Sequence, residues 1–185
     1  MLYNVSSKTY LAVNTLSEII IMITIRKYVE QDAQTTWLLF FNTIRNINKQ
    51  DYNAAQLQAW APDSMDLFIW NKRMSDIEPF IAEIDGKIVG YADLQNDGLI
   101  DHFFCHRDHL RQGVGSALML HILHVGREKK IKYYFSQVSI TAKPFFEHFG
   151  FKVVKQQLAE VGEQVLTSFY MEKPAESEVS RMETL

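Results

Sequence analysis

The stretch DHFFCHRDHLRQGVGSALMLHILHVGREK, residues 101–129, decides the fold that we predict for this chain. It continues a short, aromatic-rich run over 99–105, whose length and composition are typical of a β-strand. A polar loop follows, and the segment Arg111-Gln112-Gly113-Val114-Gly115-Ser116 leads into an amphipathic helix that we expect over 117–129. The sequence therefore predicts a strand, a glycine-rich turn and a helix in direct succession.

A glycine-rich turn at the start of a helix is suited to binding an anion. Glycines let the backbone approach a ligand without an intervening Cβ. The first amides of the helix have no partner within it, and the helix dipole favours negative charge there, so a diphosphate fits this position. Arg111 would add a charge-assisted contact.

Two established phosphate motifs do not fit the turn. The sequence contains no Gly-x-x-x-x-Gly-Lys-Ser/Thr loop, so a P-loop NTPase is unsupported. The third glycine of a dinucleotide fingerprint would fall at Ala117 or later, and no acidic ribose ligand ends a following strand.

A second motif, SITAKPFFEHFGF over 139–151, lies one expected strand (132–138) beyond the first. Together the two motifs resemble the GNAT superfamily of acetyl-CoA-dependent N-acyltransferases. The first resembles the family motif Gln/Arg-x-x-Gly-x-Gly/Ala, from Leu110 to Gly115, and the second resembles a later helix that ends in Gly-Phe. The second motif and the residues after it look most like the bacterial YafP-type branch. The resemblance covers roughly 22–173.

The resemblance implies acetyl-CoA as co-substrate and no metal. In the implied fold, the fourth and fifth strands splay apart and the pantetheine arm lies in the gap, against the backbone at the ends of those strands. The residues so implied in cofactor binding are Phe103, Phe104, Cys105, Leu110, Arg111, Gln112, Gly113, Val114, Gly115, Ser116, Ser139, Phe145 and Phe146.

Three of these positions depart from the family pattern. Leu110 stands where the motif has Gln or Arg, and Ser139 replaces a common asparagine. Phe146 stands where many relatives carry a tyrosine that protonates the leaving thiolate, so the general acid is open. Tyr170, on the last expected strand, is the substitute that we consider, although a core aromatic with a bonded hydroxyl is the alternative. A thiol has a pKa of about 8.5, so its thiolate leaves readily and an acid is not essential.

Candidates for the general base are Asp101, His102 and Asp93. Acetyl transfer from a thioester requires that the attacking amine be neutral. The intrinsic pKa of histidine makes His102 the better proton acceptor near neutrality. The resemblance favours Asp101, because relatives of this branch carry an Asp at the matching position. Adjacent strand residues point to opposite faces, so we expect at most one of this pair in the cleft. The alternative for Asp101 is a hydrogen-bonding role in a turn or sheet, and the alternative for His102 is a surface or half-buried histidine whose hydrogen bonds are satisfied.

Composition restricts the function classes. The chain has 185 residues, 47% hydrophobic and 12% aromatic, enough for one packed core. The net charge of −3 and the absence of Lys/Arg blocks give no electrostatic footprint for nucleic acid, which disfavours acylation of charged tRNA. No apolar run approaches the ~18 residues of a membrane span.

The single cysteine, Cys105, excludes an internal disulfide and a Cys-x-x-Cys metal site and is consistent with a reducing, cytoplasmic compartment. Its position in an apolar run favours a buried, inert thiol. The histidines do not have the spacing of a zinc site, so we expect none.

The order of expected elements predicts one α/β domain of the α+β type. We expect 1–21 to be a loosely ordered extension ahead of a native start at Met22, 22–173 to be the GNAT domain and 174–185 to be a flexible tail. The predicted sheet is GNAT-like, mixed and mostly antiparallel, with about seven strands, helices on both faces and a splay between the fourth and fifth strands. We expect its strands over 23–28, 80–84, 87–94, 99–105, 132–138, 151–157 and 164–171.

Three helices precede the second strand. We expect one over 33–47 capped by Asp32, one over 54–60, and one that begins at Asp63 or Ser64. Their aromatic side chains are predicted to pack in the core, and the resemblance implies that one or two line the acceptor cleft: Trp37, Phe41, Tyr52, Trp60, Phe68 and Trp70.

The function predicted from these motifs is acetyl-CoA-dependent transfer of an acetyl group to a primary amine of a small molecule or protein. An acyl-CoA-binding sensor without turnover is the alternative. We expect no nucleic-acid or membrane partner, and a monomer or homodimer, since an exposed final strand offers a pairing edge.

Overall fold

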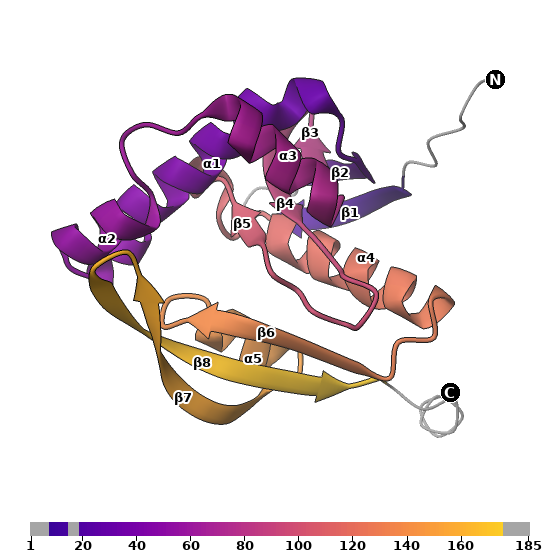
Figure 1. The fold of residues 1–185 in the computed structure, drawn as a ribbon. Helices are drawn as coiled ribbons and strands as arrows, with labels where there is room; N and C mark the ends of the chain where they lie inside the picture. Colours follow the sequence, from indigo (N-terminus) through magenta and orange to yellow (C-terminus); the bar gives the residue numbers. More distant parts are fainter. Residues whose placement is uncertain (1–7, 15–18, 176–185) are drawn as a thin grey trace.

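The computed structural model describes residues 8–14 and 19–175, whose strands form two antiparallel sheets (Figure 1). The first has five strands in sequence order and the second has the order β6-β8-β7. The first comprises β1 (Lys8–Asn14), β2 (Ile19–Lys27), β3 (Phe80–Ile84), β4 (Lys87–Ala92) and β5 (Phe103–Cys105), and the second β6 (Tyr133–Ser139), β7 (Lys152–Val161) and β8 (Gln164–Pro174).

The two sheets touch through a parallel bridge between Leu99 and Phe135. The amide of Ile100 donates to the carbonyl of Phe135 at 2.9 Å, and the amide of Phe135 donates to the carbonyl of Gly98 at 3.1 Å. Beyond this bridge β5 and β6 belong to different sheets. The predicted splay between the fourth and fifth strands of the sheet is thus confirmed, as is the fold class.

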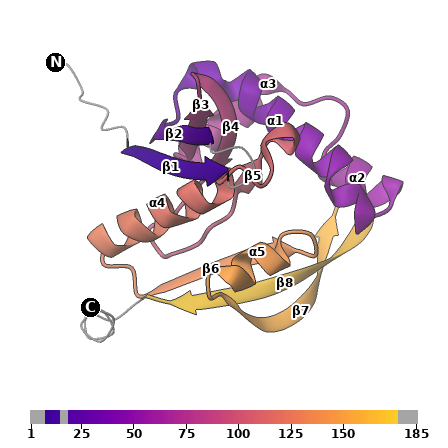
Figure 2. The same cartoon turned by 180° about the vertical axis from the view of Figure 1, so that it is seen from behind.

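Helices cover both faces of the first sheet (Figures 1 and 2). One face carries α4 (Val114–Glu128), and the buried residues between them include Ile23, Leu118 and Ile122. A second core, which includes Trp37, Phe40 and Trp70, lies against the opposite face. The helices on this face are α1 (Ala33–Asn46), α2 (Ala54–Trp60) and α3 (Leu67–Ile77), while α5 (Lys143–His148) lies beside β6.

Local sequence accounts for most element boundaries. Asp85 and Gly86 have φ of 50° and 72° and join β3 to β4 in the predicted hairpin. Gly113 has φ of 84° and precedes the first residue of α4, a conformation that glycine adopts without strain. The helix then buries one apolar face, as its periodicity predicts.

Three local predictions need correction. The strand expected over 99–105 is shortened to β5, because the carboxylate of Asp93 accepts the amides of the two residues that precede it, Asp101 and His102. The third helix begins at Leu67, where the carboxylate of Asp66 accepts the amide of Phe68 at 2.8 Å. Asp32 precedes α1, but its carboxylate does not cap that helix; it pairs with Arg26 at 2.6 Å instead.

Loose order is expected from the sequence for 1–21, but Lys8–Asn14 pairs with β2 along its whole length. The hydroxyl of Tyr10 also lies 3.1 Å from Nδ1 of His121 on α4. The expectation is therefore wrong for this strand, and a domain start at residue 22 stays a prediction. Most of the expected tail, from 176 onward, lies outside the described residues. Within the described part of the chain, no helix is long and apolar enough to cross a membrane.

Candidate functional site

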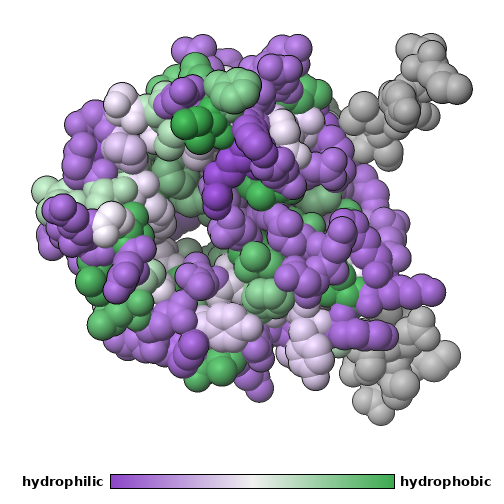
Figure 3. Space-filling view, in the orientation of Figure 1, coloured by the Kyte–Doolittle hydropathy of each residue, from purple (hydrophilic) through white to green (hydrophobic). Residues whose placement is uncertain are grey.

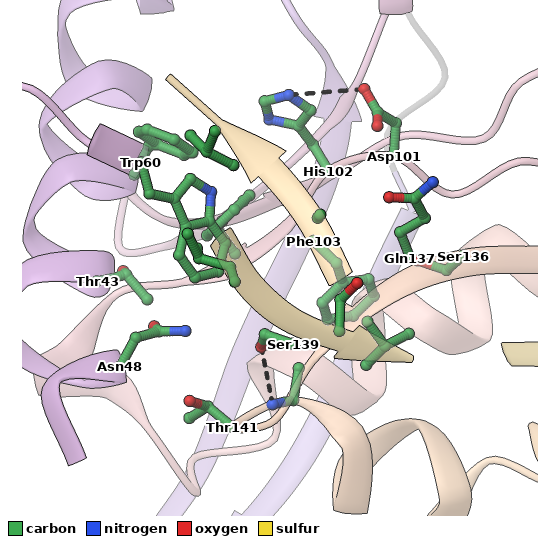
Figure 4. A pocket seen from close by; sticks show the side chains of 18 of the residues that line it. Thr43, Asn48, Trp60, Asp101, His102, Phe103, Ser136, Gln137, Ser139 and Thr141 are labelled. Carbon is green, nitrogen blue, oxygen red and sulfur yellow. Dashed lines mark hydrogen bonds and ion pairs between the residues drawn. The ribbon is translucent and has the colours of Figure 1, made fainter. Parts of the chain in front are cut away.

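A cavity of about 470 Å³ lies where β5 and β6 separate. Its walls come from those two strands, from α1 to α3 and from the β7–β8 hairpin. The space-filling view is hollowed between the helices and the second sheet (Figure 3). In the close-up, Asp101 and His102 lie at one end and Asn48 and Thr141 at the other (Figure 4). The cavity thus has two polar ends with apolar walls between them.

Alternate backbone groups of β5 and β6 point away from the strands they pair with and toward the gap. The amide of Asp93 donates to the carbonyl of His102, and the amide of His106 donates to the carbonyl of Val89, so even-numbered residues of β5 point toward β4. Phe103 and Cys105 therefore turn their amides toward the gap. On β6 the backbone amide and carbonyl of Phe135 bond to the first sheet. Because backbone groups of successive strand residues point to alternate sides, the amides and carbonyls of residues 137 and 139 face the gap.

The side chains of β5 pack on opposite sides of its sheet. Phe103 contacts Phe145 and Phe146 of α5, with ring centroids 5.2 and 5.7 Å apart, whereas Phe104 contacts Phe40 of α1 at 4.9 Å. Cys105 is half-buried, and burial raises the pKa of its thiol to about 12. Phe103, Phe104, Phe146 and Ser139, all predicted at the cofactor site, line the cavity.

The glycine-rich turn stands next to β5. A Cβ on Gly115 would lie 3.1 Å from the ring of Phe145 and 3.6 Å from Sγ of Cys105, so the first turn of α4 approaches β5 and α5 closely. The carboxamide of Gln112 bonds His109 and the carbonyl of Asp108, which braces the loop. Leu110, Arg111 and Ser116 are exposed, while Val114 is buried beneath them. The turn is thus packed close to β5 and α5 and exposes the side chains of Arg111 and Ser116 to solvent.

Asp101 and His102 meet a third residue, Arg73 of α3. Arg73 donates from Nη2 to Oδ2 of Asp101 at 2.7 Å and from Nε to Nε2 of His102 at 3.0 Å. Because Nε2 accepts, Nδ1 carries the proton, and it lies 3.1 Å from the buried hydroxyl of Tyr91. Burial, and secondarily the charge of Arg73, lowers the pKa of His102 to about 3. At neutral pH, therefore, the 3.8 Å approach of His102 to Asp101 in Figure 4 is not an ion pair.

Both Asp101 and His102 line the cavity, contrary to the expected alternation. The reason is the fully buried carboxylate of Asp93, whose Oδ1 accepts the amides of Asp101 at 3.0 Å and His102 at 2.6 Å. These bonds hold the two residues outside a regular strand. Burial raises the pKa of Asp93 to about 6. Asp93, the third base candidate, lies behind the site and is not among the residues that line the cavity.

Tyr170 lies on β8, away from the cavity. Its ring contacts Phe135 at 6.0 Å, and the amine of Lys155 lies 5.8 Å from the ring. The structure therefore does not bring it together with Asp101. A different tyrosine, Tyr52, lines the cavity, and its hydroxyl donates to the carbonyl of Thr167 and accepts the amide of Ile140.

Sequence reasoning missed Arg73 and Thr43. Arg73 follows the cavity-lining Ile69 and Trp70 at helical spacing, a signal that was available within 67–77. Thr43 donates its hydroxyl to the carbonyl of Cys105 at 2.9 Å and thereby ties α1 to β5. No feature of the sequence around Thr43 indicates that bond. No cluster of three or more potential metal ligands occurs among the described residues.

Two antiparallel sheets that separate beside a helix begun by a glycine turn are the arrangement expected of GNAT-type acyltransferases, and comparison with known proteins agrees. The family model described as an acetyltransferase (GNAT) domain matches residues 48–173. The uncharacterized N-acetyltransferase YafP of Escherichia coli K12 is 33% identical over 149 residues, which cover 80% of this chain and 94% of YafP. The chain belongs to the GNAT family and is an acetyl-CoA-dependent acetyltransferase.

Solved structures show the same fold. A GCN5-related N-acetyltransferase from Rhodopseudomonas palustris superposes with a TM-score of 0.78 at 25% identity, over 81% of this chain and 94% of that one. A putative acetyltransferase, YncA, from Salmonella typhimurium, solved with acetyl-CoA, gives a TM-score of 0.62 at 14% identity, over 84% and 95% of the two chains.

Proposed function

We propose that this acetyltransferase moves the acetyl group to a primary amine of a small molecule or protein, with Asp101 as proton acceptor. The observation that carries the proposal is the position of Asp101. Its Oδ2 is bound to Arg73, no hydrogen-bond partner of Oδ1 occurs within the described residues, and its side chain is 39% exposed at the cavity wall. A carboxylate so placed can receive a proton from an approaching amine.

The edges of the gap fit a pantetheine arm. Its two amides match the backbone groups of β5 and β6 that face the gap, as a short strand would. The unpaired amides at the start of α4, beside the exposed Arg111 and Ser116, fit the diphosphate. Bound acetyl-CoA supplies the thioester carbon that the amine attacks; the N–C bond forms, the C–S bond breaks, and the thiolate leaves. Backbone amides facing the gap are the available donors for the oxyanion.

His102 serves better as a positioning residue than as the base. Its one acceptor nitrogen is occupied by Arg73, and its lowered pKa keeps it a weak base. Tyr170 would need a different arrangement to protonate the thiolate. A cytoplasmic location and a monomeric or homodimeric state stay predictions from the sequence.

The test measures thiol release from acetyl-CoA across a broad panel of primary amines. We expect turnover with some of them, and a loss of ~10² or more in kcat in Asp101→Asn. Asp76→Asn is the matched control, because it removes an exposed carboxylate of α3 that pairs with Lys72 outside the cavity. Binding of acetyl-CoA without turnover by any amine would overturn the proposal and support the acyl-CoA sensor.

A further inference from the structure

The guanidinium of Arg73 has one edge occupied and one edge open. Nε and Nη2 form the occupied edge, which is bound to His102 and Asp101. The opposite edge, formed by Nη1 and the second hydrogen of Nη2, has no partner among the described residues, and the side chain is 51% exposed. An open guanidinium edge matches a carboxylate, which it binds through two parallel hydrogen bonds.

Buried partners hold this guanidinium in place. Arg73 is anchored by His102, which stays neutral and in turn contacts the hydroxyl of Tyr91, while Asp93 fixes the backbone of Asp101 and His102. The open edge is therefore pre-organised, and an anion that binds it does not have to order a flexible side chain.

A cation and an anion are thus offered side by side at the cavity wall. Nη2 of Arg73 and Oδ2 of Asp101 are 2.7 Å apart, and Oδ1 of Asp101 has no hydrogen-bond partner in the described chain. A ligand that satisfies both groups carries an ammonium and a carboxylate next to each other, as when both are attached to one carbon atom.

The remainder of the cavity favours an uncharged body for this ligand. Among the described residues that line the cavity, the side chains of the Arg, Lys, Asp, Glu and His types are those of Arg73, Asp101 and the neutral His102. Ile69, Trp70 and Arg73 project from α3 at helical spacing and all line the cavity, so the Arg73 side chain lies beside an apolar part of its wall. The wall continues through Phe40, Trp60, Phe104 and Leu166.

We infer that the acyl acceptor is a free α-amino acid with an apolar or aromatic side chain. Asp101 receives its ammonium, Arg73 its carboxylate, and the apolar wall its side chain. The inference rests on the function proposed above and names the acceptor class for the same site. Polycationic amines are poor acceptors in this view, because the lining offers one carboxylate and pairs it with Arg73.

The experiment compares L-phenylalanine with two analogues that lack the negative charge, 2-phenylethylamine and L-phenylalanine amide. The readout is kcat/KM for thiol release by the full chain. We expect L-phenylalanine to be favoured by at least ~10-fold over both analogues. In Arg73→Gln this preference should fall to within a few-fold, and in Arg73→Lys it should be intermediate, because lysine keeps the charge but lacks the fork. Lys72→Gln, which removes an exposed cation from the same helix, should keep the wild-type ratio.

The outcomes separate the two proposals. If the analogues are acetylated as well as L-phenylalanine, or if the preference survives in Arg73→Gln, the acceptor class is wrong while amine acetylation stands. If no amine of the broad panel is acetylated, both proposals fall. Calorimetric binding of acetyl-CoA to each variant shows whether the variant retains a folded site, and Arg73→Lys provides the second measurement if Arg73→Gln does not fold.

Discussion

Oδ1 of Asp93 accepts the backbone amide of His102 at 2.6 Å, inside the protein and without contact with solvent. The same oxygen accepts the amide of Asp101, and the amide of the Gln95 side chain donates to the other oxygen at 2.6 Å. One buried carboxyl group therefore sets the course of the backbone that carries two predicted catalytic residues.

Ionisation of Asp93 should make the protein less stable as the pH rises. Its pKa in the folded protein is raised to about 6 by burial, above the ordinary 3.8, so the folded state retains a proton that the unfolded state releases. The stabilising contribution is fully present below pH 4 and is lost between pH 4 and 6. Each unit of pKa difference corresponds to about 1.4 kcal/mol of unfolding free energy.

Urea unfolding of wild type and Asp93→Asn between pH 4 and 7 measures this effect. The difference between the two free energies of unfolding should shift in favour of the variant as the pH rises, since asparagine does not ionise. A difference that is independent of pH would contradict the shift.

The contribution of His102 to stability should change with pH in the opposite direction. Its pKa in the folded protein is lowered to about 3, so protons bind the unfolded state first when the pH falls below about 6.5. The associated stability is present above pH 6.5 and is lost progressively toward pH 3. His102→Gln should therefore lose less stability on acidification than wild type. His148→Gln, which changes an exposed histidine of α5, is the control and should follow the wild-type curve.

Ser116→Asp should separate cofactor binding from folding. Ser116 is exposed in the first turn of α4, where a negative charge stabilises the helix by about 0.3–1 kcal/mol. The same charge repels the diphosphate that we place there. We expect thermal stability to be unchanged or raised and calorimetric affinity for acetyl-CoA to fall at least ~10-fold, with little change in Ser116→Asn. Unchanged affinity in Ser116→Asp would place the diphosphate elsewhere.

Thr43→Val should weaken the connection between α1 and β5. The substitution keeps the shape of the side chain but leaves the carbonyl of Cys105 without its hydroxyl donor, at a cost of about 1–3 kcal/mol. Thr43→Ser retains the hydroxyl and should recover most of this loss. Chemical denaturation of the three proteins tests the prediction, and equal stability of the Val and Ser variants would show that the hydrogen bond contributes nothing.

Local pattern was sufficient for most elements. α2 was predicted with its observed bounds, β3 and the turn at Asp85-Gly86 were found from alternation and turn residues, and α4 began within three residues of its expected start. Errors came where side chains override local preference. The carboxylate of Asp32 was expected to cap α1 but forms an ion pair with Arg26 of β2 instead.

The catalytic end of the site was harder to predict. Asp101 was a candidate from the family resemblance and His102 from the intrinsic pKa of histidine. The expectation that only one of them faces the cleft was wrong, because Asp93 accepts both of their amides and holds them outside a regular strand. Arg73 was missed because its partners lie 28 and 29 residues away, on a different element. Tyr170 was considered as a substitute general acid, with a core aromatic as the alternative, and the structure places its ring beside Phe135, away from the cavity.

The sequence by itself determined the order of strands and helices from β2 onward and the glycine turn at the start of α4, and its two motifs carried the resemblance to the GNAT family. The strands, the helices and the turn depend on periodicity and backbone freedom, which act over a few neighbouring residues. Only the tertiary structure decided which polar groups share the cavity, which nitrogen of His102 accepts from Arg73, and that one edge of the Arg73 guanidinium has no partner among the described residues. Those properties depend on burial and on partners that are distant in the chain, and folding alone brings them together.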